Sequence, residues 1–110
     1  MRVRLIKKKT IESYSLKNAG SRNSLNIWLG NIKFADWEKP SDISDLFGSA
    51  DLLGRSSQRV VFDIAGNDYR MICKYHFGTT SVRLYIKWLG THAEYTGLCR
   101  RNQQFTINIY

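Results

Sequence analysis

Three stretches in the second half of the chain alternate apolar and polar residues, and short turn-like segments separate them. They are RVVFDI (residues 59–64), YRMICKYHF (69–77) and SVRLYIKWL (81–89), joined by AGND and GTT. Alternation with a period of two is typical of strands that bury one face, and short links containing glycine favour hairpins. The sequence therefore predicts two consecutive hairpins that form a small antiparallel sheet.

The alternation divides the side chains of this sheet between two faces, because neighbouring residues of a strand point to opposite sides. The first face is apolar and comprises Val60, Phe62, Ile64, Tyr69, Met71, Cys73, Tyr75, Val82, Leu84, Ile86 and Trp88. The opposite face is basic and comprises Arg59, Arg70, Lys74, Arg83 and Lys87, with Tyr85, His76 and Leu89 among them. Helices are expected to cover the apolar face.

Helical periodicity dominates the first half of the chain. The clearest helix follows Ser21, where four apolar residues recur at helical spacing: Leu25, Trp28, Leu29 and Ile32. Two shorter helices are predicted over residues 10–18 and 41–48, the second with Ile43, Leu46 and Phe47 turned inward. We expect an α+β fold in which N-terminal helices pack on one face of a small antiparallel sheet.

The chain length of 110 residues predicts one domain, residues 1–110, with residues 98–110 as its tail. The last six residues of this tail, 105–110, are β-prone. They are expected to form either an edge strand or an arm that binds a partner.

The charge of the chain favours a polyanionic partner. The formal net charge is +8, and residues 69–110 contain six basic residues but a single acid, Glu94. Like charges on neighbouring strands repel each other, so a basic sheet face costs stability unless an anion binds to it. A nucleic acid meets that need through its phosphates. A solvated sheet face without a ligand is the alternative.

Several classes of protein are excluded by what the sequence lacks. Its two cysteines do not provide a disulfide framework, and no apolar run approaches the length of a membrane span. Phosphate-binding glycine loops and the spacings of metal ligands are also missing, so neither a metal nor a cofactor is expected. A reducing, cytoplasmic compartment is the simplest location.

His92 and Tyr95 follow the third predicted strand in the segment THAEY. In a structural interpretation, Thr91 caps a short helical turn that carries both side chains, with Glu94 at the third helical position. In a functional interpretation they lie at the edge of the basic face, where an imidazole can exchange protons near neutral pH. Arg70 is either an ordinary exposed residue or a planar clamp for a phosphate. Tyr85 either stacks on a base or packs.

A combination of segments resembles the HigB toxins of bacterial type II toxin–antitoxin systems, within the RelE-like superfamily. The segments are SADLLG, RVVFDIAGNDYRMI and VRLYIKWLGTHAEY. The resemblance implies a RelE-like fold and ribosome-associated cleavage of mRNA. It also implies a HigA-type helix-turn-helix antitoxin, whose complex with the toxin represses their operon by binding operator DNA.

The resemblance also assigns roles to residues. Arg70 matches the strand arginine expected at the scissile phosphate, and His92 and Tyr95 match the positions of acid–base and base-stacking residues. By their charge, Arg70 and Lys87 are expected to supply the cationic stabilisation of catalysis together, with Arg59 or Arg83 assisting. The remaining residues of the basic face are expected to bind RNA, namely Arg59, Lys74, Arg83 and Tyr85. Glu94 and Asp51 are reserve candidates for the general base.

Two alternatives to a ribonuclease remain open at this point. One is a protein that binds RNA or the ribosome through the same basic face without catalysis. The other is a degenerate toxin that acts in operon repression with its antitoxin. The degenerate toxin is favoured by two positions: family members commonly carry Asn where Asp63 stands and Asp where Thr96 stands.

Overall fold

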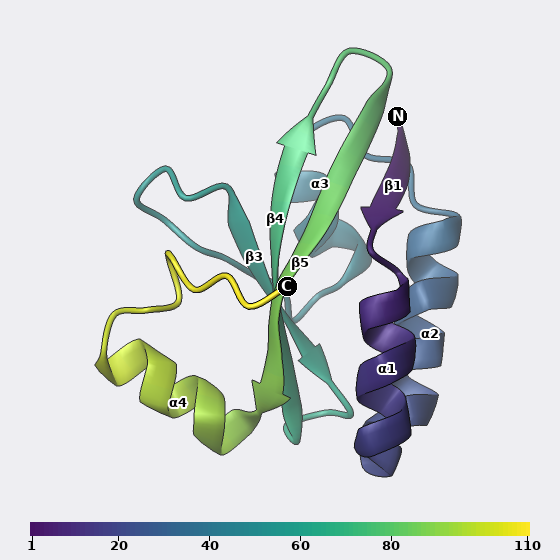
Figure 1. Cartoon of the computed structure of the whole chain (residues 1–110). Coiled ribbons are helices and arrows are strands. Elements are labelled where there is room, and N and C mark those ends of the chain that lie inside the picture. The colour runs from purple at the N-terminus through teal and green to yellow at the C-terminus, as the bar shows by residue number, and fades with distance from the viewer.

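All residues from Met1 to Tyr110 are described in a computed structural model, in which helices and strands form a mixed α+β architecture (Figure 1). The elements are β1 (Arg2–Ile6), α1 (Lys9–Lys17), α2 (Arg22–Lys33), α3 (Ser41–Leu46), β2 (Asp51–Leu52), β3 (Arg59–Ile64), β4 (Tyr69–Phe77), β5 (Ser81–Thr91) and α4 (His92–Arg100). The predicted fold class is confirmed. Strands β3 and β4 have the predicted bounds, β5 is two residues longer than predicted, and β2 was not predicted.

The sheet has the strand order β1-β5-β4-β3-β2. Strands β2 to β5 are antiparallel, as the meander predicts, but β1 pairs with β5 in parallel. The expectation of a wholly antiparallel sheet is therefore corrected to a mixed sheet. Residues 3–6, VRLI, form a short β-prone run in the sequence. Periodicity along one strand carries no information about the direction of its neighbour, so this run could not reveal the parallel pairing.

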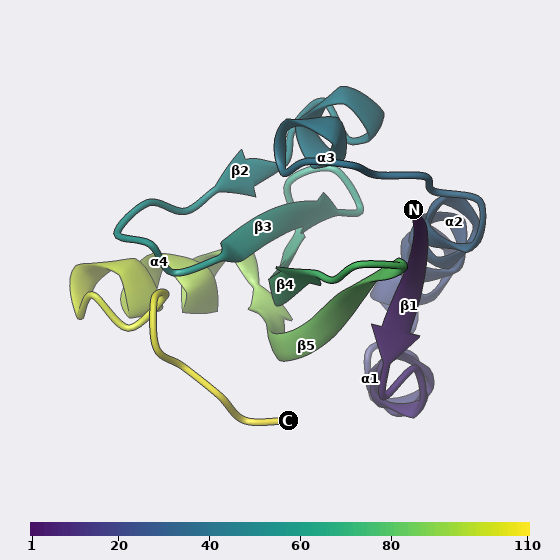
Figure 2. The same ribbon diagram turned by 90° about the horizontal axis from the view of Figure 1, so that it is seen from above.

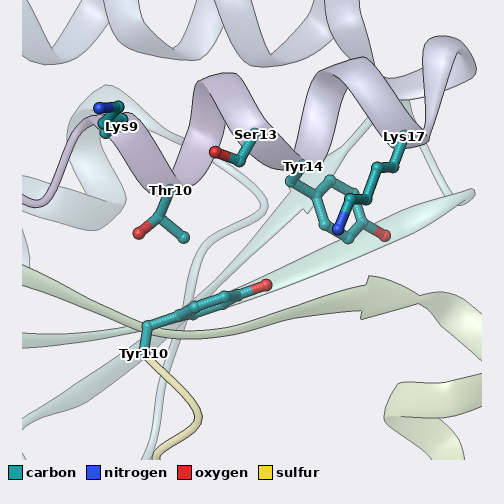
Figure 3. A pocket seen from close by; sticks show the side chains of 6 residues that line it. All are labelled: Lys9, Thr10, Ser13, Tyr14, Lys17 and Tyr110. Atoms are coloured by element: carbon teal, nitrogen blue, oxygen red, sulfur yellow. The ribbon is translucent and has the colours of Figure 1, made fainter.

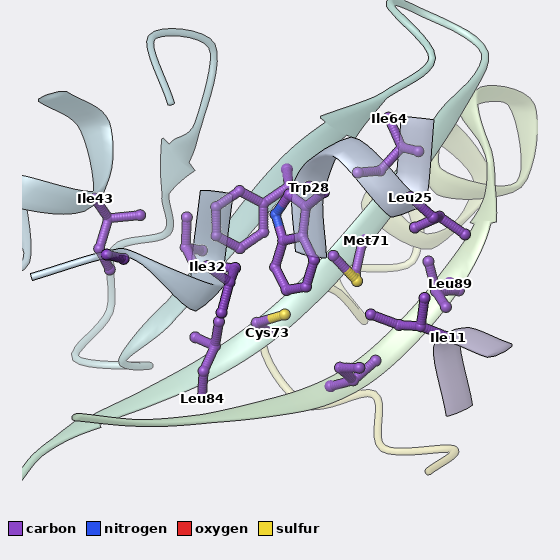
Figure 4. Packing of buried hydrophobic residues seen from close by; sticks show 14 of the residues in the cluster. Ile11, Leu25, Trp28, Ile32, Ile43, Ile64, Met71, Cys73, Leu84 and Leu89 are labelled. Atoms are coloured by element: carbon purple, nitrogen blue, oxygen red, sulfur yellow. The ribbon is translucent and has the colours of Figure 1, made fainter. Parts of the chain in front are cut away.

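Helices α1, α2 and α3 lie on one side of the sheet and bury the main core against it (Figures 1 and 4). The predicted inner face of α2 is confirmed, because Leu25, Trp28 and Ile32 are buried. In α3, Ile43 is fully buried, as predicted, whereas Leu46 is 43% exposed. The predicted inward position of Leu46 is therefore wrong. This helix has only six residues and ends at Leu46, and it presents little more than one side chain to the core.

A β-bulge in β5 exchanges the faces of two apolar residues. Cys73 pairs with Ile86, but the preceding residue Ile72 pairs with Trp88, which leaves Lys87 as the extra residue. A bulge of one residue reverses the alternation beyond it. Leu89 therefore lies in the main core, and Trp88 lies on the opposite face with Val61, Ile72 and Leu98. The predicted faces of Trp88 and Leu89 are thus corrected.

Gly90 provides the space that the Trp88 indole occupies. A Cβ atom at position 90 would lie 2.4 Å from both Cη2 and Cζ2 of Trp88. We expect Gly90→Ala to lower the free energy of unfolding by about 1–3 kcal/mol, the usual cost of overpacking. Urea denaturation followed by circular dichroism measures this change.

Gly30→Ala is the matched control for this substitution. Gly30 is exposed in α2, and a Cβ there would meet no atom within 4 Å. Because alanine favours a helix over glycine, Gly30→Ala is expected to stabilise the protein by up to about 1 kcal/mol. A Gly90→Ala protein as stable as the parent would contradict the inferred role of Gly90.

Helix α4 lies on the side of the sheet opposite α1 and α2, and the segment after it crosses toward α1, which its last residue Tyr110 faces (Figures 1 and 2). Leu98 of α4 completes a small second core with Val61, Ile72 and Trp88. The first three residues of the predicted tail, 98–100, belong to α4. From here on, the term C-terminal tail means residues 103–110. It contains no regular strand, so the expected edge strand over residues 105–110 is wrong. The basic face is consequently covered in part by helix and tail.

Candidate functional site

Arg70 lies near the start of β4, where its guanidinium is held by three groups of the protein. Its Nε forms an ion pair with Asp63 Oδ1 at 3.0 Å. Its Nη2 donates to Asn67 Oδ1 at 2.6 Å, and its Nη1 donates to the Tyr69 carbonyl at 3.0 Å. The residue is only 8% exposed. These contacts orient the guanidinium before any ligand binds.

The first turn of α4 lies beside this arginine. Gly90 pairs with Arg70 across the sheet and Thr91 pairs with Tyr69. The backbone amide of His92 donates to the Asp68 carbonyl at 2.9 Å, which anchors the start of the helix to the turn before β4. His92 itself has an exposed side chain. The sheet register therefore brings the THAEY segment to the Arg70 end of the sheet.

The predicted N-terminal cap of this helix is confirmed as a capping box. Thr91 Oγ1 accepts from the Glu94 amide at 3.2 Å, and Glu94 Oε1 accepts from the Thr91 amide at 2.8 Å. The helix extends through Arg100 and is therefore longer than the predicted short turn. The cap engages one oxygen of the exposed Glu94 carboxylate, which fixes this side chain at the start of the helix.

Tyr95 is half-buried on α4, next to Trp88, with ring centroids 6.2 Å apart. Burial raises the pKa of the Tyr95 phenol, and the neighbouring Cys99 and the charge of Asp51 raise it further, while the charge of Arg70 lowers it. The phenol therefore stays protonated at neutral pH. In this arrangement Tyr95 can donate a hydrogen bond or a proton, but it is a poor base.

A second basic cluster lies on the same face of the sheet, around a groove of about 400 Å³. The groove is lined by Lys74, Arg83, Tyr85 and Lys87, together with Gln58 and His76. The Lys87 ammonium lies 5.5 Å from the centre of the Tyr85 ring. Burial lowers the pKa of Lys87, and the positive charges of Arg59, Lys74 and Lys7 lower it further. A bound anion would relieve this repulsion.

Lys7 and Arg4 extend this cluster, and sequence reasoning did not assign either residue to the site. The parallel pairing of β1 with β5 sets Arg4 opposite Arg83, and both side chains are exposed. The basic run RVRLIKKK was visible in the sequence. What the sequence did not show was its neighbour in the sheet. Sequence reasoning also missed Asn67, the hydrogen-bond partner of Arg70, because it lies in a turn, where strand periodicity gives no information.

The predicted site residues thus form two groups rather than one. Arg70 lies next to the start of α4, which carries His92 and Tyr95, whereas Lys87 lies with Lys74, Arg83 and Tyr85. Arg70 and Lys74 are four residues apart on β4, which corresponds to about 13 Å along a strand. The apolar side chains of Ile72 and Trp88, covered by α4, lie between the two groups.

Arg59 belongs to neither group. It is 6% exposed, and its Nη1 donates to the carbonyl oxygens of Gln104 at 3.2 Å and Ile107 at 2.8 Å. Burial also lowers the pKa of its guanidinium. Its predicted exposure on the basic face is therefore corrected, because the C-terminal tail covers it. Periodicity in β3 could not reveal a cover provided by a non-regular segment.

No group of three or more His, Cys, Asp or Glu side chains is placed to hold a metal ion. None of the four helices combines the length and the apolar character that a membrane span requires.

Comparison with known proteins assigns the chain to a family. A model of the HigB toxin family, described as the RelE-like toxic component of a toxin–antitoxin system, matches residues 21–98. A search among curated proteins gave no match. The matched region includes α2, the whole β2–β5 meander, Arg70 and the first turn of α4. The resemblance seen in the sequence is confirmed, and the chain belongs to the HigB family of RelE-like toxins, each the toxic component of a toxin–antitoxin pair.

Proposed function

We propose that this toxin is a ribosome-associated endoribonuclease that cleaves mRNA and so inhibits translation. The observation that carries the proposal is the corner formed by Arg70 and the first turn of α4. A guanidinium held by three protein contacts lies there next to the strand end that leads into His92, and its charge acts on the protonated Tyr95 phenol. A preoriented cation next to groups that can transfer protons is the arrangement that phosphodiester cleavage requires.

The reaction uses the nucleophile that RNA itself carries. The 2′-oxygen loses its proton to a base and bonds to the adjacent phosphorus, and the bond from phosphorus to the 5′-oxygen breaks. An acid protonates the leaving 5′-oxygen. The products are a 2′,3′-cyclic phosphate, or the 3′-phosphate into which water opens it, and a 5′-hydroxyl end. No metal takes part in this sequence of steps.

The groups of the corner are assigned to these steps by their chemistry. Arg70 stabilises the charge that develops on the phosphoryl oxygens. His92 is the general acid or base, and Asp51 is the reserve candidate for the base. Tyr95 keeps its proton at neutral pH, so it serves as a donor or positions a base of the RNA. Lys87, from its place in the second cluster, contributes positive charge along the same RNA strand.

The second cluster is proposed to hold the flanking RNA. Lys74 and Arg83 bind phosphates, and Tyr85, which lies beside the Lys87 ammonium, is available to stack on a base. Membership of the family implies an antitoxin partner. We propose that this partner is of the helix-turn-helix HigA type and that their complex binds operator DNA. The place of action is proposed to be the cytoplasm.

A binding protein without catalysis is the second candidate, and one observation favours it. The Arg70 guanidinium is already paired with Asp63, so a phosphate must share the cation or displace the carboxylate. A protein that binds RNA at this face without cleaving it would tolerate that competition. The two candidates differ in whether RNA is cut.

Primer extension on a translated reporter mRNA distinguishes these candidates. The toxin is induced briefly in cells that lack its antitoxin. We expect discrete new 5′ ends within the coding region, because cleavage on the ribosome occurs at positions set by the reading frame. The absence of new ends while growth stops would favour the binding protein, and the absence of both effects would favour the degenerate toxin.

A further inference from the structure

Arg59 carries a buried positive charge without a carboxylate partner. None of the ion pairs in the structure includes it. Its guanidinium hydrogen-bonds only to two main-chain carbonyl oxygens of the C-terminal tail, those of Gln104 and Ile107. A buried charge that lacks a counter-ion is costly, even when it is hydrogen-bonded to neutral groups. An anion at this position would satisfy Arg59 better than the tail does.

The C-terminal tail supplies no negative side chain to this basic surface. Residues 103–110, QQFTINIY, contain no charged side chain. The tail contacts the side chain of one cation and the main chain of another. The Arg55 guanidinium lies 4.4 Å from the centre of the Phe105 ring, and the Ile109 amide donates to the Lys87 carbonyl at 3.1 Å. The side chains of the tail thus leave the charges of Arg55, Arg59 and Lys87 without a counter-charge.

Besides these contacts, Ile107 packs against the second core and Tyr110 packs against the main core, and both side chains remain partly exposed. The tail has no regular secondary structure, and Ile109 is 55% exposed. Its last residue, Tyr110, faces α1 across a hollow of about 400 Å³ (Figure 3). The loop that carries Arg55 includes three non-glycine residues with positive φ: Arg55 at 59°, Ser56 at 53° and Gln58 at 57°. Such backbone conformations cost free energy in residues other than glycine. The loop whose Arg55 contacts Phe105 is therefore strained.

We propose that the carbonyl oxygens of Gln104 and Ile107 occupy a phosphate-binding position at Arg59, and that single-stranded RNA and the C-terminal tail compete for it. The inference rests on the proposed function, which makes RNA the ligand of this face. A phosphate oxygen carries a full charge, so its hydrogen bonds to a guanidinium are stronger than those of a neutral carbonyl. Displacing the tail would join Arg59 to Lys74 and Lys87 as one continuous RNA-binding surface.

The test measures the affinity of the full-length protein for an RNA that it cannot cut. The probe is a 2′-O-methylated single-stranded oligonucleotide with a fluorescent label, and the readout is anisotropy. Ile109→Pro removes the one amide that bonds the tail to Lys87, while the exposed side chain at this position makes little contact. We expect RNA to bind about fivefold more tightly, the factor that one average hydrogen bond contributes. Ile109→Val, which keeps the amide, is the matched control and should bind as the parent does.

A second variant loosens the tail through a different contact. Phe105→Ala removes the ring on which Arg55 stacks, and it too should tighten RNA binding. The decisive comparison adds Arg59→Gln to Ile109→Pro. Without the guanidinium, loosening the tail should bring no gain, because the position that the tail vacates no longer attracts a phosphate. Thermal unfolding of each variant shows whether it is folded.

The outcomes separate this inference from the proposed function. Unchanged RNA affinity in both loosened variants, or a gain that persists in the Arg59→Gln background, overturns competition by the tail and leaves the RNA-binding face standing. The absence of RNA binding in every variant overturns both proposals. Competition at Arg59 together with intact reporter mRNA in primer extension would support this inference and remove the ribonuclease.

Discussion

Replacing Arg70 by alanine is expected to abolish growth arrest and to lower the rate of mRNA cleavage by at least 10²–10³-fold. The reason is that a preoriented donor to the charge of the transition state contributes about 3–4 kcal/mol, and three protein contacts fix this guanidinium in place. Growth after induction reports the first effect. Primer extension, or cleavage by the purified toxin on programmed ribosomes, reports the second.

The control for Arg70→Ala must separate the loss of catalysis from the loss of stability that follows when the partners of Arg70 lose their contacts. Asp63 loses its ion pair in Arg70→Ala, so a loss of stability could imitate a loss of catalysis. Asp63→Asn removes the negative charge of the same ion pair but retains the guanidinium. We expect Asp63→Asn to remain toxic, with similar thermal stability to Arg70→Ala. Full toxicity of Arg70→Ala would show that the site is wrongly assigned.

His92→Gln is expected to reduce cleavage by about 10²–10⁴-fold while RNA affinity changes less than twofold. Glutamine retains hydrogen bonding but cannot exchange protons, and proton transfer by a positioned group accounts for a factor of this size. The exposed His92 side chain takes no part in the capping box, which uses Thr91 and Glu94. Single-turnover cleavage and binding of uncleavable RNA measure the two quantities separately.

Ala93→Gln is the matched control for His92→Gln, because it places the same amide at the neighbouring exposed position of α4. This variant should cleave at the rate of the parent. Parental cleavage by His92→Gln would remove the histidine from the mechanism and direct attention to Tyr95 and Asp51. Equal loss in both variants would indicate that the helix terminus, rather than the imidazole, is needed.

The parts of the fold that the sequence predicted are those in which one chemical pattern dominates. Strict alternation located β3 and β4 to the residue, and helical spacing located the buried face of α2. The bulge at Lys87 was not predictable, because an extra residue in one strand is defined only by its partner strand. For the same reason the parallel neighbour of β5 stayed hidden until the topology was known.

The candidate site follows the same division. The Thr91 cap was predictable because a capping box is a local pattern, and the meander placed Arg70 near the segment that follows β5. The separation of Lys87 from Arg70 depended on the bulge and on the apolar cluster between them. The burial of Arg59 depended on the tail, whose course over the sheet has no signature in the spacing of its residues.

The pairing of the first strand, β1, with the last strand, β5, has a consequence for folding during synthesis on the ribosome. Arg2 is paired with Ser81 and Ile6 with Tyr85, so β1 must wait for β5 before it can join the sheet. Contacts between distant parts of a chain form late, since a long loop must close first. His92 and Tyr95 follow β5 and leave the exit tunnel later still. We therefore expect a nascent chain to remain inactive until β5 and the first turn of α4 have left the exit tunnel.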